Sequence, residues 1–104
     1  MTKRELFNAK NAGKKIEAGL HINVVSVGSF PDTDKDGHEV TVTALQDKDG
    51  SIYTTISATI NSSIDLLEDI IADEGCVEVV VNENKSNNGR EFYQLQIIYH
   101  LKQE

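Results

Sequence analysis

HEVTVTALQDKDGSIYTTIS, residues 38–57, is the stretch that decides the fold of this chain. Apolar and polar residues alternate on both sides of a short loop, which indicates two strands that each bury one face. The loop DKDG, residues 47–50, ends in an Asp-Gly pair, which is typical of turns because glycine adopts positive φ. The stretch therefore predicts a β-hairpin. Its inward side chains are predicted to be Val40, Val42, Ala44, Ile52 and Ile56. Its outward side chains are predicted to be Thr41, Thr43, Tyr53 and Thr55.

A longer strand is predicted before this hairpin, over residues 21–30. Ile22 and Val24 share one face, whereas Val25 and Val27 share the other, so the alternation changes phase. A phase change within one strand indicates a β-bulge. The residues before it, 1–19, show no clean period and carry five cations. They are expected to form a basic arm that either docks Leu6 and Phe7 on the body or remains mobile.

After the hairpin, residues 62–74 have apolar residues at helical spacing. Ser62 followed by Asp65 is a helix-start signature, and Gly75 is a typical helix stop. A strand over 76–84 follows, and a loop containing Asn-Gly joins it to the last strand, 91–101. In these two strands, the residues expected to share the inward face are Val77, Val79 and Val81, and then Tyr93, Leu95, Ile97 and Tyr99.

This element order predicts a mainly β fold. Five strands with one helix between the third and the fourth are the order of the OB-fold, so we expect a five-stranded OB-fold-like Greek-key barrel. A ferredoxin-like fold would need a helix between the first two strands, and PDTDKDG (31–37) is too short and too polar for one. The expected organisation is a basic N-terminal arm over 1–19 and a single OB-fold domain over 20–104.

The charge of the chain is unevenly distributed. The 104 residues carry a formal net charge of −7, with +3 on residues 1–20 and −10 on the remainder. An acidic body argues against nonspecific affinity for duplex DNA, which depends on phosphate neutralisation. Single strands are not excluded, because base stacking on aromatic rings supplies affinity that charge does not. With no membrane-spanning run, no signal-peptide pattern and one cysteine, the sequence predicts a cytoplasmic protein.

Sites for metals, cofactors and catalysis are not predicted. Asp32, Asp34 and Asp36 resemble the start of a calcium loop, but position twelve is Thr43 rather than a glutamate and strands flank the loop. We interpret it as a solvated acidic loop. The three histidines lack the paired spacing of zinc sites, and Cys76 heads an apolar strand, where it is expected to be a buried thiol. No nucleophile with a base partner is signalled, so an enzyme is not expected.

The candidate site is a nucleic-acid groove. OB-folds bind oligonucleotides across the strand 2–3 face and the loops that join strands 1–2 and 4–5. Here these regions are the face with Tyr53 and residues 29–38 and 84–91. Lys85 and Arg90 bracket the last of these loops, and Phe92 begins the last strand on the face opposite Tyr93.

Three segments carry a resemblance to a known family: LFNAKNAGKK (6–15), TALQDKDGSIYTTISATINSSIDLL (43–67) and KSNNGREFYQLQI (85–97). In these the chain resembles the small single-stranded DNA-binding proteins of protein-primed tailed phages. The resemblance implies tyrosines that stack bases, a role in coating displaced single strands during genome replication, and the host-cell cytoplasm as location. Tyr53 is the first residue that it assigns to DNA, followed by Tyr93 and Phe92.

We therefore expect a DNA-binding protein without sequence preference and without a cofactor, whose partner is single-stranded DNA. The predicted DNA-binding residues are Tyr53, Phe92, Tyr93, Lys85, Arg90, Lys14 and Lys15. Two alternatives remain open. One is an acidic interaction module that binds a host or replication factor, and the other is a structural subunit that pairs through its last strand. The sequence does not indicate an oligomeric state.

Overall fold

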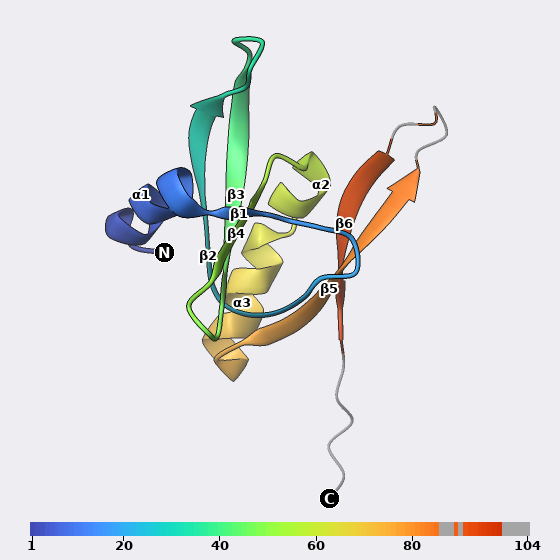
Figure 1. The fold of residues 1–104 in the computed structure, drawn as a ribbon. Helices are drawn as coiled ribbons and strands as arrows, with labels where there is room; N and C mark the ends of the chain where they lie inside the picture. Colours follow the sequence, from blue (N-terminus) through green and yellow to red (C-terminus); the bar gives the residue numbers. More distant parts are fainter. Residues whose placement is uncertain (86–88, 90, 99–104) are drawn as a thin grey trace, which may run out of the picture.

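The computed structural model describes residues 1–85, 89 and 91–98 and has a mainly β fold (Figure 1). Its elements are α1 (Lys3–Ala12), β1 (Lys14–Lys15), β2 (His21–Thr33), β3 (Glu39–Asp47), β4 (Ile52–Thr55), α2 (Ala58–Asn61), α3 (Ile64–Glu74), β5 (Val77–Lys85) and β6 (Glu91–Ile97). All strands belong to one curled sheet in the order β1-β4-β3-β2-β5-β6. Without the short β1, each strand has the same neighbours as in an OB-fold. The predicted fold class is therefore confirmed.

Strand β2 links the two halves of the sheet. Its first residues pair with β5, and its later residues pair with β3. The pairing with β3 shifts register between Val24 and Ser26, which confirms the predicted bulge. Because a bulge bends and twists its strand, β2 can take part in both halves as the sheet curls.

Helices α2 and α3 cover the inner face of the curled sheet (Figure 1). Buried aliphatic side chains of β2, β3 and β5 form the core there, together with Ile60 of α2 and Leu67 of α3. The predicted inward positions Val77, Val79 and Val81 are confirmed, with at most 4% of each exposed. Between β4 and β6, the Ser57 hydroxyl donates a hydrogen bond of 3.0 Å to the carbonyl oxygen of Tyr93. This bond joins the two ends of the sheet.

The central hairpin is confirmed, but the prediction of which side chains point inward is wrong. Ile56 is 62% exposed, whereas Thr43 is fully buried and donates a hydrogen bond of 3.0 Å to Asn61 Oδ1. Tyr53 lies opposite Leu45 and packs against the core. The reason is that residues 42–45 of β3 are all buried, so both faces of this strand are covered. Alternation in the sequence then does not reveal which face is the core.

Helix α3 ends as predicted but begins two residues later than Ser62. Gly75 ends it in the left-handed conformation at φ 84°, where glycine is favoured. Ser62 is not the N-cap, because its hydroxyl donates to the carbonyl oxygen of Thr59 in α2. The capping serine of this region is Ser57, whose hydroxyl accepts from the backbone N–H of Ile60. The sequence signature thus covers two short helices rather than one.

Helix α1 lies on the other face of the sheet, against β2 and β4. We call this the outer face and define it by Gly28, Ala44 and Thr54, which are neighbours in the strand register. A capping box begins α1: the Thr2 side chain accepts from the Glu5 N–H, and the Glu5 side chain accepts from the Thr2 N–H. Small residues bring the helix close to the strands. A Cβ on Gly28 would lie 2.8 Å from Leu6 Cδ2.

The two apolar residues of α1 behave differently. Leu6 docks beside Gly28, whereas Phe7 does not dock and is 67% exposed. Ala9 is the buried residue of the helix. Residues 3–12 of the expected basic arm are therefore helical and packed on the sheet.

The segment after α1 crosses from one end of the sheet to the other (Figure 1). Strand β1 pairs in parallel with β4, matching Lys14 with Tyr53 and Lys15 with Thr54. Ile16 then enters the core at 6% exposure. Further on, the Gly19 N–H donates to the carbonyl oxygen of Val81 on β5. The two lysines of β1 are thereby held at the edge of the sheet.

Candidate nucleic-acid interface

A groove of about 390 Å³ runs beside α1. It extends from the outer face of β2 and β3, at Phe30 and Val42, to the gap between β4 and β6, at Thr55 and Tyr93. Phe30 and Val42 are opposite each other in the β2–β3 register, so they form one apolar patch of its floor. The full lining is Ala9, Lys10, Gly13, Lys15, Ile16, Phe30, Asp32, Val42, Thr54, Thr55, Ile56 and Tyr93.

The groove combines cations with aromatic rings. Lys10 of α1 and Lys15 of β1 are exposed, and one carboxylate, that of Asp32, lies among the same lining residues. The rings of Phe30 and Tyr93 are half-buried. Lysine ammonium groups contact phosphates, and aromatic rings stack bases of any identity. The arrangement thus has the two kinds of contact that a single-stranded nucleic acid needs.

Two of the predicted DNA-binding residues, Tyr93 and Lys15, line this groove. Lys14 precedes Lys15 in β1 and does not line the groove. The pKa of Asp49 is lowered mainly by its hydrogen bonds with Ser51 and to a smaller extent by the charge of Lys14. Tyr53 is half-buried on the core side and does not line the groove.

The structure does not bring Phe92 or Lys85 into the groove. Phe92 and Lys85 belong to the β5–β6 hairpin, where Phe92 lies opposite Asn84. The neighbouring surface of this hairpin is an amide ladder, with hydrogen bonds of 2.9 Å from Asn82 to Gln96 and 2.7 Å from Asn84 to Gln94. The prediction for Arg90 lies outside the residues that the structure describes.

Sequence reasoning missed Phe30 and Ile56. Lys10 was considered only as one of the five cations of residues 1–19, because no helix was expected there. Ile56 was expected in the core, yet it is 62% exposed at the groove. Phe30 could have been found, because the bulge fixes the phase of the later part of β2 and places it on the same face as Gly28.

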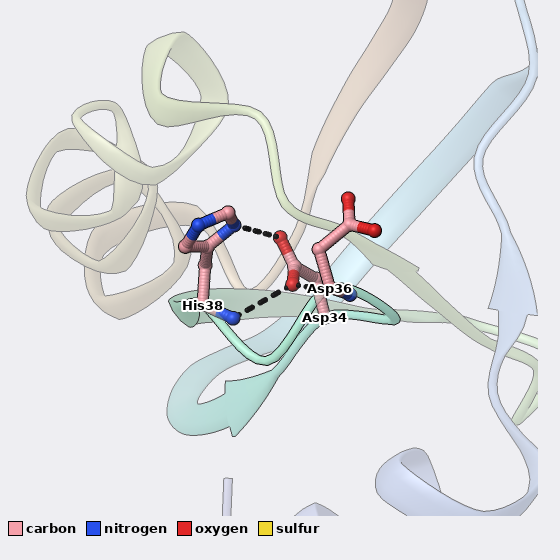
Figure 2. A group of neighbouring side chains, drawn as sticks. All are labelled: Asp34, Asp36 and His38. Atoms are coloured by element: carbon pink, nitrogen blue, oxygen red, sulfur yellow. Dashed lines mark hydrogen bonds and ion pairs between the residues drawn. The ribbon is translucent and has the colours of Figure 1, made fainter.

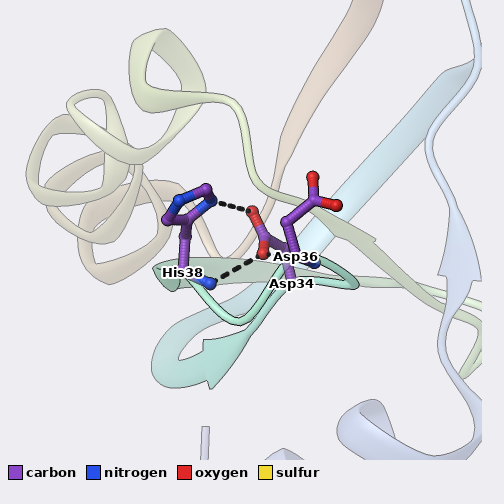
Figure 3. A network of polar contacts seen from close by, with 3 residues as sticks. All are labelled: Asp34, Asp36 and His38. Atoms are coloured by element: carbon purple, nitrogen blue, oxygen red, sulfur yellow. Dashed lines mark hydrogen bonds and ion pairs between the residues drawn. The ribbon is translucent and has the colours of Figure 1, made fainter.

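The acidic loop between β2 and β3 is organised as a turn (Figures 2 and 3). Asp34 Oδ1 accepts hydrogen bonds of 2.9 Å from the backbone N–H groups of both Asp36 and His38. Asp34 Oδ2 lies 3.5 Å from His38 Nδ1. Possible metal-ligating atoms of these three residues come within 4.8 Å of one another, and Asp32 is not among them. The hydrogen bonds of Asp34 give the cluster a structural explanation as an Asx-type turn.

A curled OB-fold-like sheet with a basic and aromatic groove is the architecture of proteins that bind single-stranded nucleic acids. The comparison with protein families agrees, because residues 2–98 match the model of the phage single-stranded DNA-binding protein family. The chain belongs to this family.

Two relatives carry the same description. The single-stranded DNA-binding protein of Bacillus phage B103 is 33% identical over 90% of this chain and 84% of its own length. That of Bacillus phage PZA is 29% identical over 89% of this chain and 82% of its own length. No solved structure gives a significant match. In the described part of the chain, no helix has the length and apolarity needed to cross a bilayer.

Proposed function

We propose that this protein binds single-stranded DNA without sequence preference and coats strands that are displaced during phage DNA replication in the host cytoplasm. The observation that carries the proposal is the groove beside α1, which sets Lys10 and Lys15 together with Phe30 and Tyr93. Family membership supports the same ligand. The role is one of binding rather than catalysis.

The groove gives a physical reason for the lack of sequence preference. Every base has a π-face, so stacking on Phe30 and Tyr93 tolerates any base. Lys10 and Lys15 would contact the backbone, which is the same at every nucleotide. Duplex DNA keeps its bases stacked inside and offers only phosphates, and the charge of −10 beyond residue 20 opposes a purely electrostatic contact. Single strands are therefore favoured.

The other residues predicted for DNA form a second, more distant group. Lys14 would contribute from beside the groove, and Tyr53 would support it from the core side. A bound DNA strand would contact Phe92, Lys85 and Arg90 only if it continued from the groove to the β5–β6 hairpin. Lys15 and Lys85 thus make a matched pair: both are exposed lysines at strand ends, and only Lys15 lines the groove.

The test is a titration with poly-dT at several salt concentrations, followed by tyrosine fluorescence, which no tryptophan obscures. Quenching that reverses with salt is expected. Lys15→Gln should lower the affinity and reduce the salt slope by about 0.7, the value for one phosphate contact on a single strand. Lys85→Gln should have the smaller effect. Equal effects would argue against the groove as the binding site, and absence of any binding would favour a protein-interaction module instead.

A further inference from the structure

Helix α1 has an exposed surface that the groove does not include. Phe7 is 67% exposed, the highest value among the large apolar side chains that the structure describes. A single exposed apolar residue is common on protein surfaces, so the ring gains meaning only from its neighbours, since an aromatic ring beside cations can stack a base. Sequence reasoning expected this ring to dock on the body, and it does not.

The position of Phe7 on the helix connects it with cations. Successive helical residues are separated by about 100°, so Lys3, Phe7 and Lys10 lie within about 60° of one another around the axis. Lys3 and Lys10 are both exposed. We call these three residues the α1 stripe. It is an aromatic ring between two ammonium groups on one face of the helix.

The α1 stripe is continuous with the groove, because Lys10 belongs to both. Lys10 also lines the adjoining hollow formed by residues at the end of β2 and the start of β3. Ala9 anchors α1 at 2% exposure and lies about 100–160° around the axis from the three stripe residues. The stripe is therefore presented by a helix that is packed on the sheet, at the edge of the groove.

We infer that single-stranded DNA leaving the groove continues over helix α1, where a base stacks on Phe7 and the ammonium groups of Lys3 and Lys10 contact the neighbouring phosphates. This inference rests on the proposed function and extends its site. The exposed face of α1 then acts as an additional DNA-binding element beside the groove. The occupant is a polyanion with exposed bases, since the stripe offers two cations and a ring, whereas the carboxylates of Asp32 and Glu39 line the hollow on the strand side of Lys10.

The first experiment compares Phe7→Ala with Leu66→Ala. Leu66 is the matched control, because it is 57% exposed on α3, a helix with five acidic residues and no cation. Affinity for a long oligo-dT should fall about fivefold or more in Phe7→Ala, as expected for one stacked base. A short oligo-dT of about 4 nucleotides is enough to fill the groove alone. Its affinity for Phe7→Ala should equal its affinity for the parent protein. Leu66→Ala should match the parent with both.

The outcomes separate this inference from the proposed function. If Lys15→Gln weakens binding while Phe7→Ala binds the long oligonucleotide like the parent, the path over α1 is wrong and the groove stands. If Phe7→Ala weakens short and long oligonucleotides equally, Phe7 acts within the groove or through the fold, and the extended path is also wrong. If no variant and no parent protein binds oligo-dT, the proposed function itself fails.

A direct probe complements these affinities. Phe7→Trp places the only tryptophan of the chain on the α1 stripe, and Leu66→Trp places it on α3. Long oligo-dT should quench the emission of Phe7→Trp and leave that of Leu66→Trp unchanged. Quenching in neither variant, or equal quenching in both, would overturn the assignment of DNA to α1. Circular dichroism of each variant confirms that the fold is retained.

Discussion

Helices α1 and α3 have similar lengths and pack on opposite faces of the same sheet, yet they differ in charge and in how they dock. Helix α1 carries three cations and one acid, whereas α3 carries five acids and no cation. Helix α1 docks through Ala9 and Leu6 against small residues, and α3 docks through Leu67 in the main core. Helix α3 is therefore part of the main core, whereas α1 leaves its cations and Phe7 on the surface.

The largest expected effect tests the packing of α3 in the core. Leu67 is 1% exposed in the core, whereas its neighbour Leu66 is 57% exposed on the same helix. Leu67→Ala should lower the free energy of unfolding by about 2–5 kcal/mol, through lost burial and the cavity left behind. Leu66→Ala should change it by less than about 0.5 kcal/mol, as usual for a surface position. Urea denaturation measures both values. Similar losses in the two variants would contradict the placement of α3.

The contrast also explains how much of the fold could be predicted. Helix α3 was predicted because Ile64, Leu67 and Ile71 make a periodic stripe of large residues and Gly75 stops it. The strands were predicted because large apolar side chains alternate along them. The bulge of β2 was predicted because this alternation changes phase. Helix α1 was missed because its close approach uses Ala9, Gly13 and Gly28, and small residues leave no hydrophobic period.

The candidate site was predicted only in part for the same reason. Tyr93 and Lys15 were chosen from the sequence and line the groove. Phe30 was not, and Lys10 was named only among the five cations of residues 1–19, since the groove exists only once α1 lies on the outer face. The covering of that face also reversed the expected orientation of Tyr53. A surface assembled from two distant segments is a tertiary feature, which local patterns do not encode.

A smaller effect is expected at the first turns of the two helices. The N-cap of α1 is Thr2, whose side chain takes part in a capping box, whereas that of α3 is Ser63, which makes no side-chain capping hydrogen bond. Thr2→Ala should therefore destabilise α1 by about 1 kcal/mol, the typical value for loss of a cap. Ser63→Ala should cost α3 less. Hydrogen exchange of the amides of each helix measures the local effect, and a larger loss of protection in α3 would contradict it.

The smallest expected effect is a pH dependence of the first turn of α1. The pKa of Glu5 lies below its ordinary value of 4.5, first because of its backbone hydrogen bond with Thr2 and then because of the side-chain one. A depressed pKa means that the charged form stabilises the folded helix. This contribution is fully present above the ordinary value and is lost as the pH falls through the folded-state pKa.

Acidification below about pH 4.5 should thus loosen the first turn of α1 before it disturbs the rest of the chain. The pKa of Asp49 is also lowered, mainly by its hydrogen bonds with Ser51 in the central hairpin, so a global melting curve would mix two groups. Tryptophan emission from Phe7→Trp is the suitable local measurement, because that position lies on α1 itself. Adding Glu5→Gln should flatten the acid transition of this emission, since glutamine still accepts the Thr2 N–H hydrogen bond and does not titrate. If the transition persists unchanged in the double variant, Glu5 does not control it, and the stability of α1 at low pH must depend on its packing against the outer face.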